Sequence, residues 1–263
     1  MEPPSPAAKA ARLPRTITLL SLIPDSGKTV ACVNLAVALV ALGHTVLVVD
    51  LDPAATATRV FDHFGLPAGD GGAVDAVLSG LAPLAAILRP TLSTRLWLAP
   101  AGEGPAPGAV RDDDPAAAAG RLDFAALAPP LPAFEFVLLD TPSASAERPW
   151  LDLLAATEAL VPIRPGLDAL HAITPALQLI VEARRQRRDP LRFLGVWPIA
   201  TTPERAWRAV RAKLREYRLP WLTPIRRVPA LKKTLLPGQL HRRLLTIACP
   251  RHRANDGLPP GRP

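Results

Sequence analysis

The feature that most constrains the fold is the continuous apolar run Val46-Leu47-Val48-Val49, which leads directly into Asp50. A run without a polar face is typical of a strand that is buried on both sides in a parallel sheet. Further strand candidates lie at residues 95–99, 134–140, 159–163, 194–200 and 221–225. The pattern favours an open, mostly parallel α/β sheet.

Residues 16–50 form one complete βαβ unit. Residues 16–22 alternate and are β-branched, as in a strand, and residues 30–42 are rich in Ala, Val and Leu, as in a helix. Gly43 follows this helix at a position where glycine commonly ends one. The crossover to the strand at residues 45–50 should be right-handed. Further helices are predicted at 74–88, 169–187 and 203–217, and residues 100–133 are predicted to be mostly loop with one helix at most.

The expected fold class is therefore α/β, with a mostly parallel twisted sheet flanked by helices in one domain. Residues 1–14 are predicted as a disordered leader, residues 15–248 as the domain, and residues 249–263 as a flexible tail. Apolar residues make up 49% of the chain, enough for a sizeable core. The chain contains 32 Pro and 16 Gly residues. Together they make up about 18% of it, which is below the level typical of a disordered chain.

Composition excludes several classes of protein. The two cysteines, Cys32 and Cys249, are too few for a disulfide framework or a cysteine-rich zinc site. No apolar run reaches the roughly 18 residues that span a bilayer, and the first residues lack the apolar stretch of a signal peptide. We therefore expect a cytoplasmic protein without stable membrane insertion.

The formal net charge of +8 hides a strong asymmetry. Residues 1–183 carry 11 Lys or Arg and 19 Asp or Glu, a net of −8, whereas residues 184–263 carry 20 and 4, a net of +16. A cationic third of this kind favours a polyanionic partner such as nucleic acid or anionic lipid. A merely solvated, arginine-rich face is the alternative.

A strand, the sequence Ser26-Gly27-Lys28-Thr29 and a helix follow one another, which is the context of a phosphate-binding loop. Backbone N–H groups at the start of a helix point at phosphates, and a lysine ammonium there lies on the outer phosphates. A threonine hydroxyl in this position ligates Mg²⁺. Gly27 allows the backbone to turn and to approach the ligand closely.

Carboxylates follow two of the predicted strands. Asp50 and Asp52 come at the end of one strand and Asp140 at the end of another, where open α/β sheets place their ligands. Carboxylates gathered at one edge repel one another, and a magnesium nucleotide supplies a reason to collect them. The alternative is that they cap helices in strand-to-helix loops, which is common.

These segments resemble the ParA/MinD family of deviant P-loop ATPases, and the ParA branch in particular. The similar segments are residues 27–36, residues 43–53 and the run Phe136-Val137-Leu138-Leu139-Asp140-Thr141-Pro142, with residues 159–163 and 194–196 in register with later strands. The resemblance covers about residues 15–240, with matching motif order and spacing. It implies a P-loop fold, ATP and Mg²⁺ as cofactors, an ATP-dependent homodimer, and cycling on and off the nucleoid.

The resemblance also implies a role for each matching residue. Ser26, Gly27, Lys28, Thr29 and Val30 would surround the phosphates, with Lys28 on the outer ones and Asn34 in support. Mg²⁺ would be held by Thr29 and, partly through water, by Asp50 and Asp140. Asp52 would orient the attacking water, so that Asp52 and Lys28 are the catalytic candidates.

The first half of the loop departs from the family pattern Lys-Gly-Gly-x-Gly-Lys-Thr. Ile23 replaces the lysine that reaches the partner's nucleotide in the family dimer, and Pro24 and Asp25 replace two glycines. Leu22 occupies the conventional first glycine position. Proline removes an N–H donor, and an aspartate beside phosphates is unfavourable. Three states therefore stay open, namely a slow ATPase, a nucleotide-binding switch without turnover, and a pseudo-enzyme.

Arginines crowd the helix predicted at residues 203–217. The candidate DNA contacts are Arg205, Arg208, Arg211 and Arg215, spaced along one helical face, together with Arg226 and Arg227. The resemblance implies sequence-independent DNA binding by such a surface, which should weaken steeply with salt. Residues 240–247 mix basic and apolar side chains, which leaves a membrane-surface helix as another interpretation.

Two functions of different classes follow. The first is a ParA-like ATP-binding protein, a weak ATPase that positions or partitions DNA or another large cargo on the nucleoid with a cargo adaptor or ParB-like partner. The second is a non-hydrolysing ParA-like scaffold that binds a partner protein, with a membrane-surface MinD-like regulator as a further alternative. The substitutions Ile23, Pro24 and Asp25 favour the scaffold.

Overall fold

The computed structural model describes residues 13–62, 73–91, 93–102, 119–124, 127, 132–142, 151–164, 169–199 and 204–222. They contain a seven-stranded sheet in the order β3-β4-β2-β5-β1-β6-β7. Its strands are β1 (Arg15–Leu19), β2 (Val46–Asp50), β3 (Arg89–Pro90), β4 (Leu96–Ala99), β5 (Phe136–Asp140), β6 (Glu158–Ile163) and β7 (Arg192–Pro198). All neighbours pair in parallel except β3 and β4, so the expected mostly parallel α/β sheet is confirmed.

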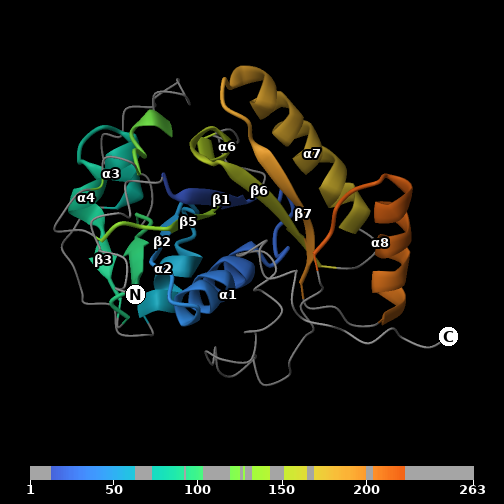
Figure 1. Ribbon diagram of the computed structural model, residues 1–263, viewed down its shortest axis with the longest axis horizontal. Coiled ribbons are helices and arrows are strands. Elements are labelled where there is room, and N and C mark those ends of the chain that lie inside the picture. Colours follow the sequence, from blue (N-terminus) through green and yellow to red (C-terminus); the bar gives the residue numbers. More distant parts are fainter. Residues whose placement is uncertain are drawn as a thin grey trace, which may run out of the picture.

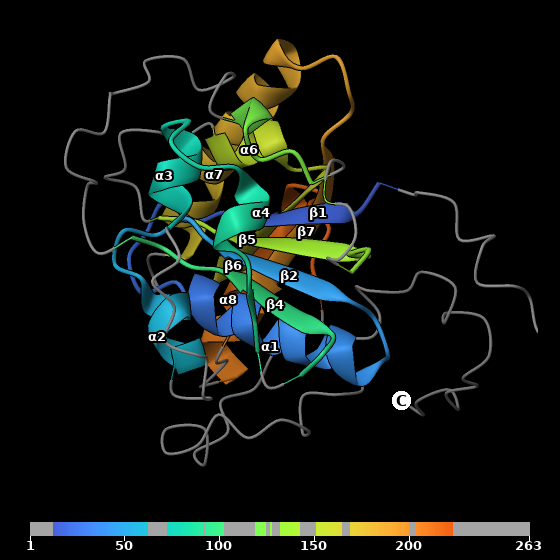
Figure 2. The same cartoon turned by 90° about the vertical axis from the view of Figure 1, so that its left-hand side faces the viewer.

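Helices cover both faces of this sheet (Figures 1 and 2). The described helices are α1 (Lys28–Ala41), α2 (Thr56–Asp62), α3 (Val74–Leu78), α4 (Leu84–Ile87), α6 (Leu151–Ala155), α7 (Ala169–Gln186) and α8 (Glu204–Glu216). Helices α1 and α2 bury their apolar side chains in one core cluster, whereas α3, α4, α6, α7 and α8 share the other. The sheet thus forms the middle of three layers.

The central strands are buried as their apolar sequences predict. Every residue of β2 and of β5 is buried, as expected of apolar runs that lie between two helical layers. Cys32 of α1 and Trp197 of β7 are buried in the same cluster, while Trp97 is half-buried. Helix α1 ends at Ala41, before Gly43, and begins at Lys28, two residues before its predicted start.

Some predicted elements were wrong. The continuous helix over residues 74–88 is two short helices, because the chain turns at Ser79 and Gly80 and Pro83 precedes α4. Helices α2 and α6 and the two-residue antiparallel strand β3 were not predicted. The strand expected at residues 221–225 is a single parallel bridge between Trp221 and Val196, and residues 223–225 lie outside the described part.

The topology brings the functional segments to one edge of the sheet. Strand β5 pairs with both β1 and β2, in a register that places Asp140 beside Leu19 and beside Asp50. Because parallel strands end at the same edge, the loops after β1, β2 and β5 meet there. In the described part of the chain, no helix combines the length and the apolar character needed to span a membrane.

Candidate nucleotide-binding site

The loop between β1 and α1 turns into the helix at Gly27. This residue has φ +92°, a left-handed conformation that L side chains rarely adopt, and it stands at the N-cap of α1. A Cβ atom added to Gly27 would lie 3.1 Å from Cγ2 of Ile199, just beyond β7. Glycine is therefore required here both by the backbone conformation and by the close packing against Ile199.

The side chains on either side of Gly27 are buried. Ser26 has a buried hydroxyl oxygen without a hydrogen-bond partner in the described part of the chain. Lys28 is 5% exposed at the first position of α1. Burial lowers the pKa of Lys28, and the negative charges of Asp140, Asp52 and Asp25 act against that decrease. A cation and a polar hydroxyl thus lie buried at a helix N-terminus, which suits an anionic ligand.

Asp140 ends β5, in register with Leu19 and Asp50 at the same edge of the sheet. It is completely buried, and neither carboxylate oxygen has a hydrogen-bond partner of good geometry among the described residues. Burial, and next the charge of Asp50, raise the pKa of Asp140 to about 8, while the Thr29 hydroxyl and Lys28 act to lower it. A buried carboxylate that lacks well-formed hydrogen bonds is costly, so a cation is a natural ligand for it.

Asp50, in contrast, is held by the protein itself. Its Oδ2 accepts hydrogen bonds from the backbone N–H and the hydroxyl of Thr58, both at 2.8 Å, and its Oδ1 accepts one from the Asp52 N–H at 3.2 Å. Burial raises the pKa of Asp50, and these hydrogen bonds oppose the rise. Asp50 therefore anchors the start of α2 as well as facing the site.

Asp52 follows the end of β2 and is half-buried. Its Oδ1 accepts a hydrogen bond from the N–H of Ala54 at 2.9 Å, in a turn that places Ala55 at φ +51°. The charge of Asp52 acts on both Lys28 and Asp140. This carboxylate is the one nearest to solvent of the three at the strand ends.

The remaining predicted cofactor residues lie on the first turns of α1. Thr29 is half-buried, whereas Val30 is 45% exposed. The side-chain amide of Asn34 donates a hydrogen bond to the carbonyl of Val30 at 2.6 Å. Asn34 thus stabilises the first turns of the helix that carries the loop.

Sequence reasoning missed two residues that shape the site. Thr58 holds Asp50, and its hydroxyl also accepts a hydrogen bond from the N–H of Ala101 at 3.0 Å. Ile199 packs against Gly27. The sequence did not indicate either residue. Thr58 lies in α2, which was not predicted, and Ile199 was predicted only as part of an apolar strand.

The arginine face of α8 is solvent-exposed where the structure describes it. Arg208 and Arg215 are exposed and Arg211 is half-buried, whereas Trp207, Val210 and Leu214 are buried in the core cluster that α8 shares with α7. The side chain of Arg215 approaches the Trp221 ring to 6.0 Å. The Arg205 side chain, Arg226 and Arg227 lie outside the described part, so the whole predicted DNA surface stays a prediction.

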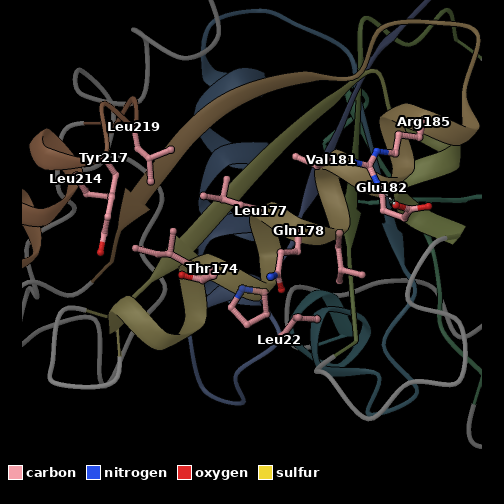
Figure 3. Close-up of a pocket in the computed structure, with 13 residues that line it drawn as sticks. Leu22, Thr174, Leu177, Gln178, Val181, Glu182, Arg185, Leu214, Tyr217 and Leu219 are labelled. Atoms are coloured by element: carbon pink, nitrogen blue, oxygen red, sulfur yellow. Dashed lines mark hydrogen bonds and ion pairs between the residues drawn. The ribbon is translucent and has the colours of Figure 1, made fainter.

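A groove of about 970 Å³ lies along α7 and the end of α8 (Figure 3). Its apolar lining includes Leu177 and Val181 of α7, Leu214 of α8 and the exposed Tyr217. Leu22, at the root of the phosphate loop, belongs to the same lining. The groove therefore adjoins the start of the loop on the side of α7 and α8.

These residues fit a magnesium nucleotide. The described residues contain no cluster of three or more His, Cys, Asp or Glu that could hold a metal ion by themselves. Mg²⁺ in nucleotide sites is held by one or two carboxylates together with phosphate oxygens and water, so Asp140 beside the loop is sufficient.

The sequence matches the model of the CobQ/CobB/MinD/ParA nucleotide binding domain over residues 17–240. The chain belongs to this family. The match covers most of the chain, and it confirms the predicted ParA/MinD-type fold. No curated protein sequence matches significantly.

Solved structures of similar proteins have the same fold, and three of them contain a bound nucleotide or nucleotide analogue. A cobyrinic acid a,c-diamide synthase from Mycobacterium smegmatis, with bound ATP analogue and magnesium, is 26% identical, with a TM-score of 0.69 over 82% of this chain and 88% of that one. The McdA(D38A)–ATP complex from Cyanothece is 16% identical, with a TM-score of 0.73 over 89% and 95%. MinD from Pyrococcus horikoshii, with Mg-ADP, is 22% identical, with a TM-score of 0.64 over 84% of each chain.

Proposed function

We propose that this protein binds ATP and Mg²⁺ and is a ParA-like switch with weak ATPase activity that positions or partitions DNA or another large cargo on the nucleoid. The observation that carries the proposal is the buried carboxyl of Asp140, which has no hydrogen-bond partner of good geometry among the described residues, together with Lys28 and the Gly27 turn. The family match and the nucleotide-bound relatives support the choice of ligand.

Each residue has a role in this proposal that follows from its position. The N–H groups from Ser26 to Val30 and the ammonium of Lys28 would bind the phosphates. Mg²⁺, held by Thr29 and Asp140 with Asp50 behind them, would neutralise charge that develops on the phosphates. Asp52, near solvent, would orient water.

Weak turnover is consistent with how Asp52 is held. Its carboxylate accepts a hydrogen bond from the Ala54 N–H, so one of its oxygens is already engaged when it must orient a water molecule. Ile23 has no charge to offer a partner's nucleotide, which weakens the case for a family-type ATP-dependent homodimer. We therefore expect the protein to hydrolyse ATP slowly in the absence of a partner.

The exposed arginines of α8 support non-specific DNA as a partner. Arg208, Arg211 and Arg215 lie on one side of the helix, where like charges repel one another unless phosphates neutralise them. A cargo adaptor or ParB-like protein would be the second partner. Nucleoid association would then follow from DNA binding.

The second candidate is a scaffold that binds nucleotide or a partner protein without hydrolysis. Ile23, Pro24 and Asp25 favour it, because they remove the charge and the backbone freedom of the family loop.

Phosphate release and DNA binding in the same preparation separate the two. We expect slow Mg-dependent phosphate release that is lost in Lys28→Ala and retained in Lys213→Ala, a matched lysine variant on the surface. DNA binding should increase with ATP and fall steeply with salt. If the protein binds nucleotide but releases no phosphate, the scaffold function is favoured over the ATPase. If no salt-sensitive DNA binding is detected in any nucleotide state, the nucleoid role is ruled out.

A further inference from the structure

The first half of the phosphate loop offers few groups to a phosphate. The N–H of Ile23 lies 3.4 Å from the Ser21 hydroxyl oxygen and points back into the loop. Pro24 has no N–H group. Backbone donors to a ligand therefore begin only at Asp25 and are concentrated at the start of α1.

Asp25 places a negative charge in the same half of the loop. It is exposed and has φ +56°, a left-handed conformation that aspartate tolerates better than most residues. Its charge acts on Lys28, as do the charges of Asp52 and Asp140. Three carboxylates thus act on the lysine of the site, and only Asp25 belongs to the loop that must surround the phosphates.

We propose that Asp25 makes this site select a nucleoside diphosphate over the corresponding triphosphate. The inference rests on the proposed nucleotide binding and adds the identity of the resting ligand. A triphosphate brings one more negative charge than a diphosphate, and repulsion by Asp25 is correspondingly larger for it. Pro24 supplies no donor that could offset this repulsion.

The size of the effect follows from Coulomb's law in a solvent-exposed loop. One additional charge a few ångströms from an exposed carboxylate changes an affinity by about tenfold, and by less when salt screens the pair. The charge of Asp25 should therefore lower the affinity for Mg-ATP relative to that for Mg-ADP by about tenfold. A slow ATPase of this kind would retain its product.

The test compares the wild type with Asp25→Asn, which removes the charge, keeps the shape and also tolerates the left-handed conformation. Dissociation constants for Mg-ADP and for a non-hydrolysable Mg-ATP analogue are measured by calorimetry at low and high salt. We expect Asp25→Asn to strengthen binding of both ligands, that of the analogue by about tenfold more than that of Mg-ADP, with a smaller salt dependence.

Asp62→Asn, at the exposed end of α2, is the matched control and should change neither constant. Equal changes in both constants, or none, in a folded Asp25→Asn would overturn the selection by Asp25 while leaving nucleotide binding intact. Absence of binding to both ligands in both proteins would overturn the proposed function as well.

Discussion

Replacing Asp140 by asparagine tests the most unusual group in the site. The carboxyl of Asp140 is buried without a hydrogen-bond partner of good geometry in the described part of the chain, and its pKa is raised from 3.8 to about 8. Asparagine has the same shape and carries no charge. We expect Asp140→Asn to be more stable than the wild type in the absence of nucleotide, although it removes a proposed Mg²⁺ ligand.

The sign follows from proton linkage. Between the two pKa values the folded state keeps a proton on Asp140 that the unfolded chain has lost. Stability is thus full below the unfolded pKa and decreases as pH rises towards the folded one, by up to about a factor of ten in the folding equilibrium per pH unit. Relaxation and water entry reduce such penalties, so we expect Asp140→Asn to gain about 2–4 kcal/mol near neutral pH.

Urea unfolding in EDTA, from about pH 5 to about pH 8, measures this effect. The wild type should lose stability across the range, and Asp140→Asn should lose much less. Binding of Mg²⁺ and nucleotide should release a proton from wild-type Asp140, which appears as a calorimetric enthalpy that depends on the buffer. Parallel pH profiles for the two proteins would refute the argument that Asp140 is buried as a neutral acid.

Three further predictions concern neighbouring features. Gly27→Ala should lower the free energy of unfolding by about 1–3 kcal/mol, because a side chain there is strained by its positive φ and meets Ile199, and thermal unfolding measures this loss. Thr58→Val removes the hydroxyl that donates to Asp50 and should cost about 1–3 kcal/mol in urea unfolding. Arg208→Ala and Arg211→Ala should each reduce the slope of log DNA affinity against log salt by about one, measured by fluorescence anisotropy.

Each of these predictions has its own control. Gly43 also has a positive φ, but a Cβ added to it would meet nothing within 4 Å, so Gly43→Ala separates backbone strain from the contact with Ile199. Thr58→Ser retains the hydroxyl and should recover most of the loss. An unchanged salt slope in both arginine variants would show that α8 does not face DNA.

Much of the fold could be predicted because its strands are locally unambiguous. Val46 to Val49 and the run before Asp140 have no polar face, so they can only be buried on both sides. The structure of residues 74–88 was harder to predict. Their apolar content favours a helix throughout, and the break depends on a turn at Gly80 and on Pro83, whose effect is set by packing on the sheet.

The site was predictable only in outline. The ends of the predicted strands indicated Asp50, Asp52 and Asp140. They did not indicate that Thr58 would hold Asp50, or that Asp140 would lack a hydrogen-bond partner of good geometry among the described residues. That difference arises from contacts between segments far apart in the chain. The close approach of Ile199 to Gly27 is likewise a tertiary contact, and no local pattern indicates it.

The measurement that tests the central claim most directly is the affinity for Mg-ADP and Mg-ATP by calorimetry, with wild type beside Lys28→Ala. The account predicts binding by the wild type that weakens by about 10- to 100-fold when the ammonium is removed, as expected for a hydrogen bond to a charged phosphate. It also predicts that folded Lys213→Ala binds as the wild type does. Absence of binding to the wild type, or equal binding by Lys28→Ala, would contradict a working phosphate loop.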